Sequence, residues 1–173
     1  MDFLGTMLRR MGLASLTASS TQVTNATTNV DSLSHTIPAN TLEVGSVYRV
    51  TALFAFVHTA AATPTITVEW LINGAVILTA VLTPPSTAAT FGVRADVLFT
   101  VRTVGASGTF ISWLEARMSA SAADGPHGVA AQDAVTTTVD TTLSRTVLVR
   151  ARMTTAVASN SLRCNQAFIE RVR

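Results

Sequence analysis

Hydrophobic and polar residues alternate along much of the chain after residue 30. This period of two residues is typical of a β-strand that has one buried face and one exposed face. In residues 91–104, for example, Val93 and Val97 fall on one face and Arg94 falls on the other. The same alternation predicts nine strands, at residues 30–37, 47–58, 65–72, 75–82, 91–104, 109–119, 134–139, 145–153 and 162–172. Nine strands separated by short turns predict an all-β protein, folded as a sandwich or a barrel.

Turn-forming residues separate these strands. Pro38 ends the first strand, because proline cannot donate a hydrogen bond to a β-ladder. Asn73 and Gly74 alone separate two alternating segments, which predicts a tight hairpin with a type I′ turn. A Pro-Pro pair at 84–85 breaks the sheet, and residues 120–132, with an Asp-Gly-Pro sequence, are expected to form a loop.

The first 29 residues have a different pattern. Residues 1–14 place their apolar side chains on one side of a helix, which predicts a short amphipathic helix. So short a helix is marginally stable alone and needs a surface to pack on, either another protein or its own sandwich. The candidate anchor residues for a partner protein are Phe3, Leu4, Met7, Leu8, Arg9, Arg10 and Met11. Residues 15–29, rich in Ser, Thr and Asn, predict an extended arm that lies along a neighbour in an oligomer and is mobile in a monomer.

The length of 173 residues suits one β-sandwich domain, residues 30–173, preceded by the helix and arm of residues 1–29. An immunoglobulin sandwich takes about 100 residues and has a Cys–Trp–Cys core. This β region is longer and the chain has a single cysteine. Eight core strands plus an arm strand favour a jelly-roll β-sandwich of eight or nine antiparallel strands.

The amino-acid composition indicates which kinds of partner the protein can have. Charged residues are 13% of the chain and hydrophobic residues 48%, so we expect apolar surface to be buried between subunits. No apolar run reaches the roughly 18 residues that span a bilayer, and the start lacks a secretory signal pattern, so assembly in a cytoplasm is expected. The basic residues are all arginine, which suits interfaces better than lysine. They are not interleaved with aromatic platforms, which argues against a nucleic-acid groove.

The sequence contains few residues in arrangements that are typical of catalysis. The chain has no phosphate loop with lysine and no Gly-x-Ser-x-Gly nucleophile elbow. The three histidines, His35, His58 and His127, have no ligand at strand spacing, and Asp124 near His127 comes closest to a pair, so no metal or other cofactor is expected. Cys164 alternates within a predicted strand and is expected to be a small buried hydrophobic residue. The carboxylates are dispersed, and the pattern predicts no enzymatic activity.

The two tryptophans differ in their surroundings. Trp70 shares a strand face with Ile66 and Val68, which predicts a place in the core. Trp113 shares its face with polar residues that include Arg117. We therefore expect Trp113 and Arg117 to form an interface or a glycan-binding face.

Two segments carry a resemblance to a known family. The first corner, residues 36–50, reads Thr-Ile-Pro-Ala-Asn-Thr-Leu-Glu-Val-Gly-Ser-Val-Tyr-Arg-Val, and the second corner, residues 98–110, reads Leu-Phe-Thr-Val-Arg-Thr-Val-Gly-Ala-Ser-Gly-Thr-Phe. The Asn-Gly hairpin at 73–74 and the Ala-Ser-Asn-Ser turn at 158–161 fit the same pattern. From residue 30 to 173, the chain resembles the jelly-roll domain of tailed-bacteriophage virion structural proteins, which include capsid decoration (cement) proteins and tail appendages.

This resemblance implies a non-enzymatic virion protein with no catalytic residues to transfer. It implies a homotrimer that is assembled in the host cytoplasm and lies on the capsid surface, where it stabilises the head by binding the major capsid protein. The alternative is a tail or fibre appendage that binds a host-surface glycan. Neither reading implies direct contact with nucleic acid or with a membrane.

Overall fold

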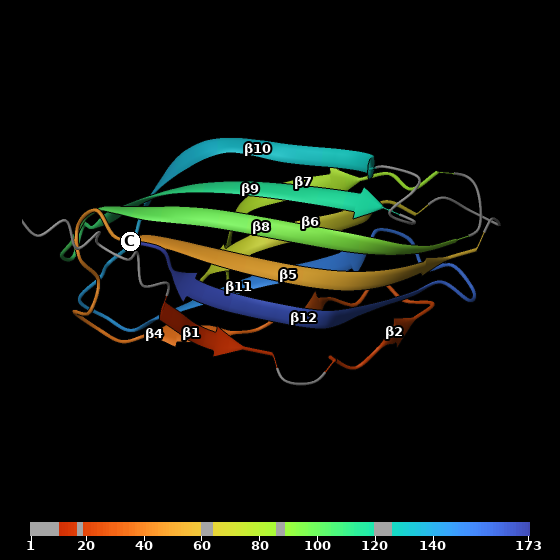
Figure 1. The fold of residues 1–173 in the computed structure, drawn as a ribbon, viewed down its shortest axis with the longest axis horizontal. Helices are drawn as coiled ribbons and strands as arrows, with labels where there is room; N and C mark the ends of the chain where they lie inside the picture. The colour runs from red at the N-terminus through yellow and green to blue at the C-terminus, as the bar shows by residue number, and fades with distance from the viewer. Residues whose placement is uncertain (1–10, 17–18, 60–63, 86–88, 120–125) are drawn as a thin grey trace, which may run out of the picture.

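The computed structural model describes the chain except for residues 1–10, 17–18, 60–63, 86–88 and 120–125. In this described part the chain forms twelve β-strands and no helix, and the strands make two antiparallel sheets packed face to face (Figure 1). The predicted all-β sandwich is confirmed. Within the same residues there is no helix long and apolar enough to cross a membrane.

The larger sheet has seven strands in the order β1-β12-β5-β8-β9-β10, with β2 also paired to β12. Its strands are β1 (Met11–Ser15), β2 (Val23–Thr24), β5 (Val47–His58), β8 (Ala89–Thr103), β9 (Thr109–Ser119), β10 (Pro126–Thr138) and β12 (Ser161–Arg171). The smaller sheet has five strands in the order β3-β11-β6-β7, with β4 also paired to β11. Its strands are β3 (Val30–Asp31), β4 (His35–Ile37), β6 (Ile66–Ile72), β7 (Ala75–Leu82) and β11 (Arg145–Met153).

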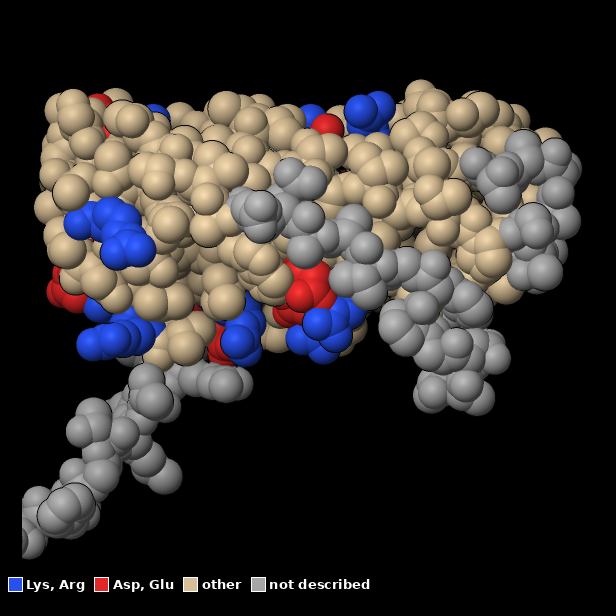
Figure 2. Space-filling view, turned by 90° about the horizontal axis from the view of Figure 1, so that it is seen from above, with Lys and Arg blue, Asp and Glu red and all other residues tan. Residues whose placement is uncertain are grey.

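The two long flanks of the sandwich differ. On one flank the first four strands, which include part of the predicted arm, lie along the chain's own sandwich, because β1 and β2 pair with β12, and β3 and β4 pair with β11. On the other flank the sheets end at β7 and β10, which pack against each other without pairing. Figure 2 looks onto this second flank, where residues without charge cover most of the surface.

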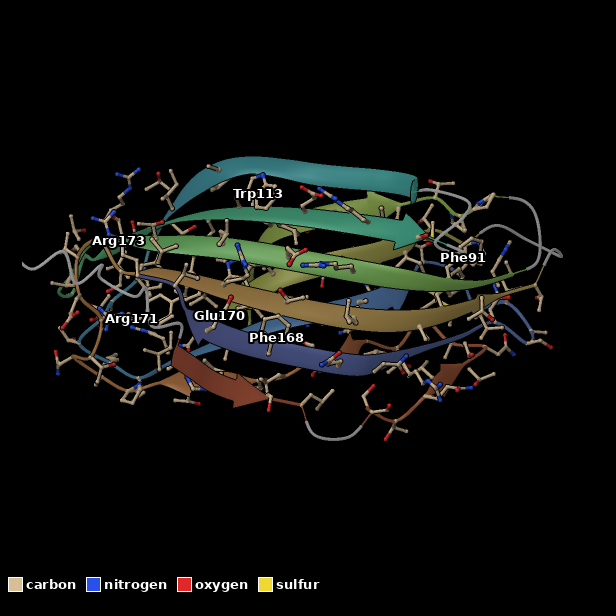
Figure 3. The ribbon with its side chains drawn as sticks, viewed as in Figure 1. Phe91, Trp113, Phe168, Glu170, Arg171 and Arg173 are labelled. Carbon is tan, nitrogen blue, oxygen red and sulfur yellow. The ribbon has the colours of Figure 1, made fainter. Side chains whose placement is uncertain are left out.

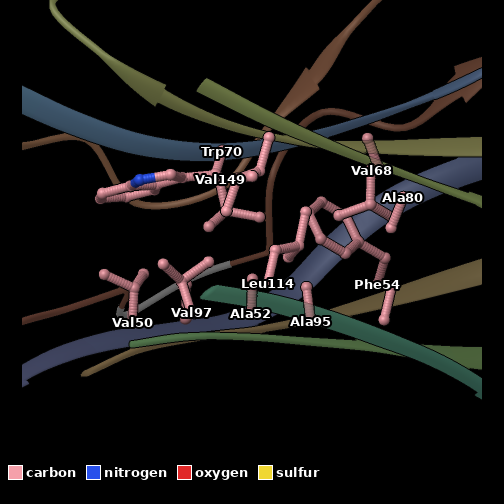
Figure 4. Packing of buried hydrophobic residues seen from close by; sticks show 14 of the residues in the cluster. Val50, Ala52, Phe54, Val68, Trp70, Ala80, Ala95, Val97, Leu114 and Val149 are labelled. Carbon is pink, nitrogen blue, oxygen red and sulfur yellow. The ribbon is translucent and has the colours of Figure 1, made fainter. Parts of the chain in front are cut away.

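The core between the sheets is built from the inward-facing residues of alternating strands. Trp70 is fully buried there, and its ring stacks on that of Phe99 with centroids 5.4 Å apart. Tyr48 and Phe110 also stack on Phe99, at 4.8 and 5.6 Å. Figure 4 shows Trp70 and its aliphatic neighbours packed between the two layers. Each large side chain buried in this way contributes about 1.5–3 kcal/mol, so the inward faces hold the sheets together. The predicted core position of Trp70 is confirmed.

Three predicted element boundaries are wrong. Residues 11–14, expected in a helix, belong to β1, because the edge of β12 offers hydrogen-bond partners to a segment too short for a stable helix. The rest of that helix, residues 1–10, lies outside the described residues. Strand β10 takes in the described end of the expected loop at 120–132, because it pairs along β9. The strand expected at 30–37 is divided into β3 and β4, which both pair with β11.

Candidate functional site

The two corners that carry the sequence resemblance meet in the structure. Asn40, in the first corner, donates its backbone N–H to the carbonyl of Thr141 at 3.0 Å. Thr141 donates its own N–H to the carbonyl of Gly105, in the second corner, also at 3.0 Å. The Oγ1 of Thr141 accepts the N–H of Gly105 at 2.7 Å. Residues 139–145 thus join both corners into one hydrogen-bonded unit, which we call the corner end.

The residue types at the corner end follow from its backbone. Asn40, Gly45 and Gly105 have positive φ angles of 59°, 85° and 111°, which Asn and Gly adopt at the lowest cost. Gly108 is required for a different reason, because a Cβ there would lie 2.8 Å from the carbonyl oxygen of Val139 and 2.9 Å from a second carbonyl oxygen. The packing around Gly108 is therefore too close for any side chain, and the loops are held in place.

Three aliphatic side chains project into solvent from this fixed scaffold. Val44, Val104 and Leu143 are 63%, 48% and 56% exposed. Val44 directly precedes Gly45, whose N–H donates to a carbonyl of β8 at 2.8 Å, and Val104 directly precedes Gly105. All three lie on the adjoining loops of the corner end. We call these three side chains the apolar tips.

Arg171 anchors the first corner to the end of β12. Its guanidinium forms an ion pair with the carboxylate of Glu43 and donates a hydrogen bond to Oγ of Ser46 at 2.8 Å. The hydrogen bond with Glu43 raises the pKa of Arg171. Beside it, burial raises the pKa of the Tyr48 hydroxyl, although the positive charge of Arg171 acts in the opposite direction. The guanidinium of Arg171 thus pairs with polar groups of the first corner itself.

Arginines also surround the other loops of the corner end. Arg145 lies 3.6 Å from the carboxylate of Asp140, and hydrogen bonds from Thr142 lower the pKa of that carboxyl group. Arg102 and Arg173 are exposed, and Figure 3 shows Arg173 near Arg171 at this end of the sandwich. The described loops here therefore carry more arginines than acidic side chains, so the apolar tips lie within a positively charged surrounding.

Both ends of the described chain reach the corner end. Val47 donates its N–H to the carbonyl of Arg173 at 3.0 Å, which holds the last residue against β5 (Figure 1). Strand β1 starts with Met11 opposite Arg171. Residues 1–10, with all the candidate anchor residues except Met11, lie outside the described residues and join the chain at this end.

Trp113 and Arg117 lie elsewhere, on the outer face of the larger sheet. Trp113 is half-buried on β9, opposite Leu98 of β8, and Figure 3 shows it on the same face as Phe168. Arg117 is exposed and forms an ion pair with Glu115. The structure does not bring this pair close to the corner end, and its role as an interface or glycan face stays a prediction.

A second ion pair occupies the middle of this outer face. Nε of Arg94 donates to Asp96 at 2.6 Å, and the hydroxyl of Thr51 donates to the same carboxylate at 2.7 Å. Burial alone would raise the pKa of Asp96, but these hydrogen bonds and the charge of Arg94 outweigh it and lower the pKa. Next to Arg94, a groove of about 870 Å³ is lined by Leu53, Gln166 and others. Apolar residues such as Phe91 line much of it, and the amide of Gln166 and the ion-paired Arg94 add polar groups.

Among the described residues, those considered for nucleophilic or metal chemistry are not assembled into a site. Cys164 is fully buried, as predicted, and burial raises the pKa of its thiol to about 11, so it stays protonated at neutral pH. No group of three or more His, Cys, Asp and Glu residues in the described part of the chain is placed to hold a metal ion. His127 lies in β10, and Asp124 lies outside the described residues.

The apolar tips were missed by the sequence reasoning. Val44 and Val104 each stand directly before a glycine that turns the chain, and an aliphatic residue in that place has no strand neighbour to cover it. That signal was available in the sequence for these two residues. Leu143, in a Thr-Thr-Leu-Ser stretch, has no comparable signal, because its exposure depends on how the three loops come together.

The chain is similar in fold to two solved structures. One is the CBM2 module of the Lactobacillus casei BL23 phage J-1 evolved Dit, with 13% identity and a TM-score of 0.41, covering 81% of this chain and 69% of that chain. The other is a legume lectin-like domain from Entamoeba histolytica, with 8% identity and a TM-score of 0.31, covering 81% of this chain and 79% of that chain. No protein-family model and no curated protein sequence matches the chain. Neither structural likeness is close enough to assign a function.

Proposed function

We propose that this chain is a non-enzymatic structural protein of a tailed-phage virion, a homotrimeric decoration protein that docks on the major capsid protein through its corner end. The observation that supports this most is the presence of three exposed aliphatic side chains on loops that hydrogen bonds hold in place. The same end carries an excess of arginine, and the predicted anchor segment joins the chain there. In this proposal the protein is assembled in the host cytoplasm and lies on the capsid surface.

Rigid apolar tips favour docking for a simple energetic reason. Burying a whole Val or Leu side chain contributes about 1.5–3 kcal/mol, so covering the exposed half of each tip contributes about 1 kcal/mol. Little of this is lost to ordering, because the loops are already fixed around Gly108 and Thr141. The arginines around the tips suit a partner surface whose apolar depressions are bordered by carboxylates.

The N-terminal segment extends the contact beyond the tips. Ten residues reach at most about 33 Å when extended, enough to reach a neighbouring subunit from the corner end. Phe3, Leu4, Met7 and Leu8 would supply the apolar contacts, and Arg9 and Arg10 the charge. In a trimer three such segments act together, and linked weak contacts bind far more tightly than each alone.

Binding to empty capsids of the same phage tests this proposal. The triple variant Val44→Ser, Val104→Ser, Leu143→Ser should bind about 100-fold more weakly in co-sedimentation, from about 3 kcal/mol of lost contact at 1.4 kcal/mol per tenfold. Val57→Ser is the matched control, because Val57 is 36% exposed and lies on β5 away from the corner end. Unchanged binding by the triple variant would refute docking through the corner end.

The anchor is tested separately by deletion of residues 1–10. Removal of residues 1–29 would also take away β1 and β2, which cover the edge of β12, so the shorter deletion is the cleaner test. It should weaken capsid binding while leaving the melting temperature unchanged. Full binding by the shortened protein would show that the segment is not an anchor.

A glycan-binding tail appendage is the second candidate, favoured by Trp113 and the groove beside Arg94 on one outer face. A half-buried tryptophan offers a flat apolar surface, and the groove offers polar donors. A glycan array with the purified protein would decide this reading. Binding that is lost in Trp113→Ala would support it, and absence of binding across the array would exclude it in favour of the capsid proposal.

A further inference from the structure

We propose that this chain self-associates through the flank formed by the edge strands β7 and β10, so that a second copy of the chain covers this flank. Among the described strands, β7 and β10 are the last of their sheets on this side, whereas β1 to β4 cover the opposite flank. The inference deepens the oligomer in the proposed function by assigning its contact surface, and it does not depend on which surface contacts a capsid.

Strand β7 and residues 134–138 of β10 carry no charge, and Asp133 is the one acidic residue in the β10 sequence. Strand β7, with the sequence Ala-Val-Ile-Leu-Thr-Ala-Val-Leu, has no charged residue over its eight positions. Val76 and Val81 on this strand are 45% and 52% exposed, and Val135 on β10 is 42% exposed. Threonines 136–138 continue the neutral surface along β10. Figure 2 shows this side of the molecule, with the charged residues mostly along its margins and toward one end.

The edge of β7 also lacks the features that keep an edge strand from pairing with another chain. Edge strands in soluble proteins are typically short, or carry charged residues, proline or a covering segment. Strand β7 is eight residues long, contains neither proline nor a charge, and has β6 as its one hydrogen-bonded neighbour among the described strands. Its outer backbone groups are therefore oriented for pairing with an added strand.

A second copy is the occupant that fits this surface best. A partner with charged groups would lose their hydration against β7 without gaining a counter-charge there, which is unfavourable. Another copy presents the uncharged strand β7 and the uncharged residues 134–138 of β10. Around a three-fold axis the β7 side of one copy faces the β10 side of the next, as the proposed trimer requires. Between the strands, a hollow of about 280 Å³ is open to a side chain from the facing copy. It is lined by Ala75, Ile77, Thr137 and Thr138, and at one end by Asp140 and Arg145, whose charges pair with each other. Aliphatic residues at the centre with few charges are typical of subunit interfaces.

Sedimentation velocity and light scattering of the full chain over a range of concentrations test this inference. The wild-type protein should self-associate, and Val76→Arg and Val81→Arg should each raise its dissociation constant at least about tenfold, because each places an unpaired charge in the contact. Val57→Arg is the matched control, since it makes the same change at an exposed strand valine outside the flank. Far-ultraviolet circular dichroism and a melting curve check that all three variants are folded.

Three results would overturn the inference. These are a wild-type protein that stays monomeric at every concentration, flank variants that associate like the wild type, and a control variant that loses association to the same extent. Because the readout is association in solution without capsids, its failure is distinct from a failure of docking through the corner end. Capsid binding by folded, monomeric Val76→Arg would then report on the corner end alone.

Discussion

Replacing Gly108 by alanine should destabilise the corner end and weaken the binding of a partner there. The added Cβ would lie 2.8 Å from the carbonyl oxygen of Val139 and 2.9 Å from that of Thr103, and also 2.9 Å from Cγ2 of Thr141. Two of these three atoms belong to the backbone of neighbouring segments, so they cannot move aside as a flexible side chain would. The second corner must shift away from residues 139–145.

The size of the effect follows from this geometry. Forcing an extra methyl group into a fully packed position costs about 1–3 kcal/mol, and rigid backbone neighbours place Gly108 near the upper end, at about 2–3 kcal/mol. For a chain of this length each kcal/mol lowers the melting temperature by about 2–4 °C, so we expect a decrease of about 4–12 °C. The shift would also move Val104 relative to Leu143, and capsid binding should weaken.

Thermal unfolding followed by circular dichroism measures the first effect, with Gly92→Ala as the matched control. A Cβ at Gly92 would have its nearest neighbour at an ordinary 3.8 Å, from the carbonyl oxygen of Ser119, and the backbone there does not require glycine. That substitution should leave the melting temperature unchanged or raise it slightly, because alanine restricts the unfolded chain. Equal melting temperatures for Gly108→Ala and the wild type would refute the reasoning, as would an equal decrease in the control.

Other predictions concern the ion pairs and the buried thiol. Arg150→Ala should lower the free energy of unfolding by about 2 kcal/mol in urea titrations, because Arg150 lies 2.6 Å from the carboxylate of Glu69, whose side chain is only 8% exposed. Arg94→Ala should lower the free energy of unfolding by less than about 1 kcal/mol, because the Arg94 side chain is mostly exposed. The folded state lowers the pKa of Asp96, so its stabilising contribution is present above the unfolded pKa of about 3.9 and is lost as pH falls through the folded pKa. The difference in melting temperature between Asp96→Asn and the wild type at pH 7 should therefore shrink below about pH 4; a constant difference would contradict this. Cys164 should react with a thiol reagent such as DTNB at neutral pH only after unfolding, and rapid reaction in the native protein would contradict its burial.

Local alternation was enough to predict most strands and the core. The segment around Trp70, the Asn73-Gly74 hairpin and the buried Cys164 all follow from a period of two residues and from turn chemistry, which act over a few positions. The structure confirms each of them. Such features are readable because the strand itself decides which side chains share a face.

Features that depend on distant partners were not predictable in this way. Residues 11–14 form a strand because they pair with the edge of β12. The described end of residues 120–132 belongs to β10 because it pairs with β9. The corner end depends on Thr141, which lies far in sequence from both corners and joins them by hydrogen bonds of its backbone and its hydroxyl group. The surface proposed for docking therefore depends on how the three loops come together.

The central claim, that the corner end docks on the capsid, is tested most directly by an electron cryomicroscopy reconstruction of particles that carry this protein. We expect the sandwich to stand on the head with Val44, Val104 and Leu143 against the major capsid protein. A sandwich bound to the shell with its corner end directed to solvent, or density on the tail with none on the head, would contradict the account.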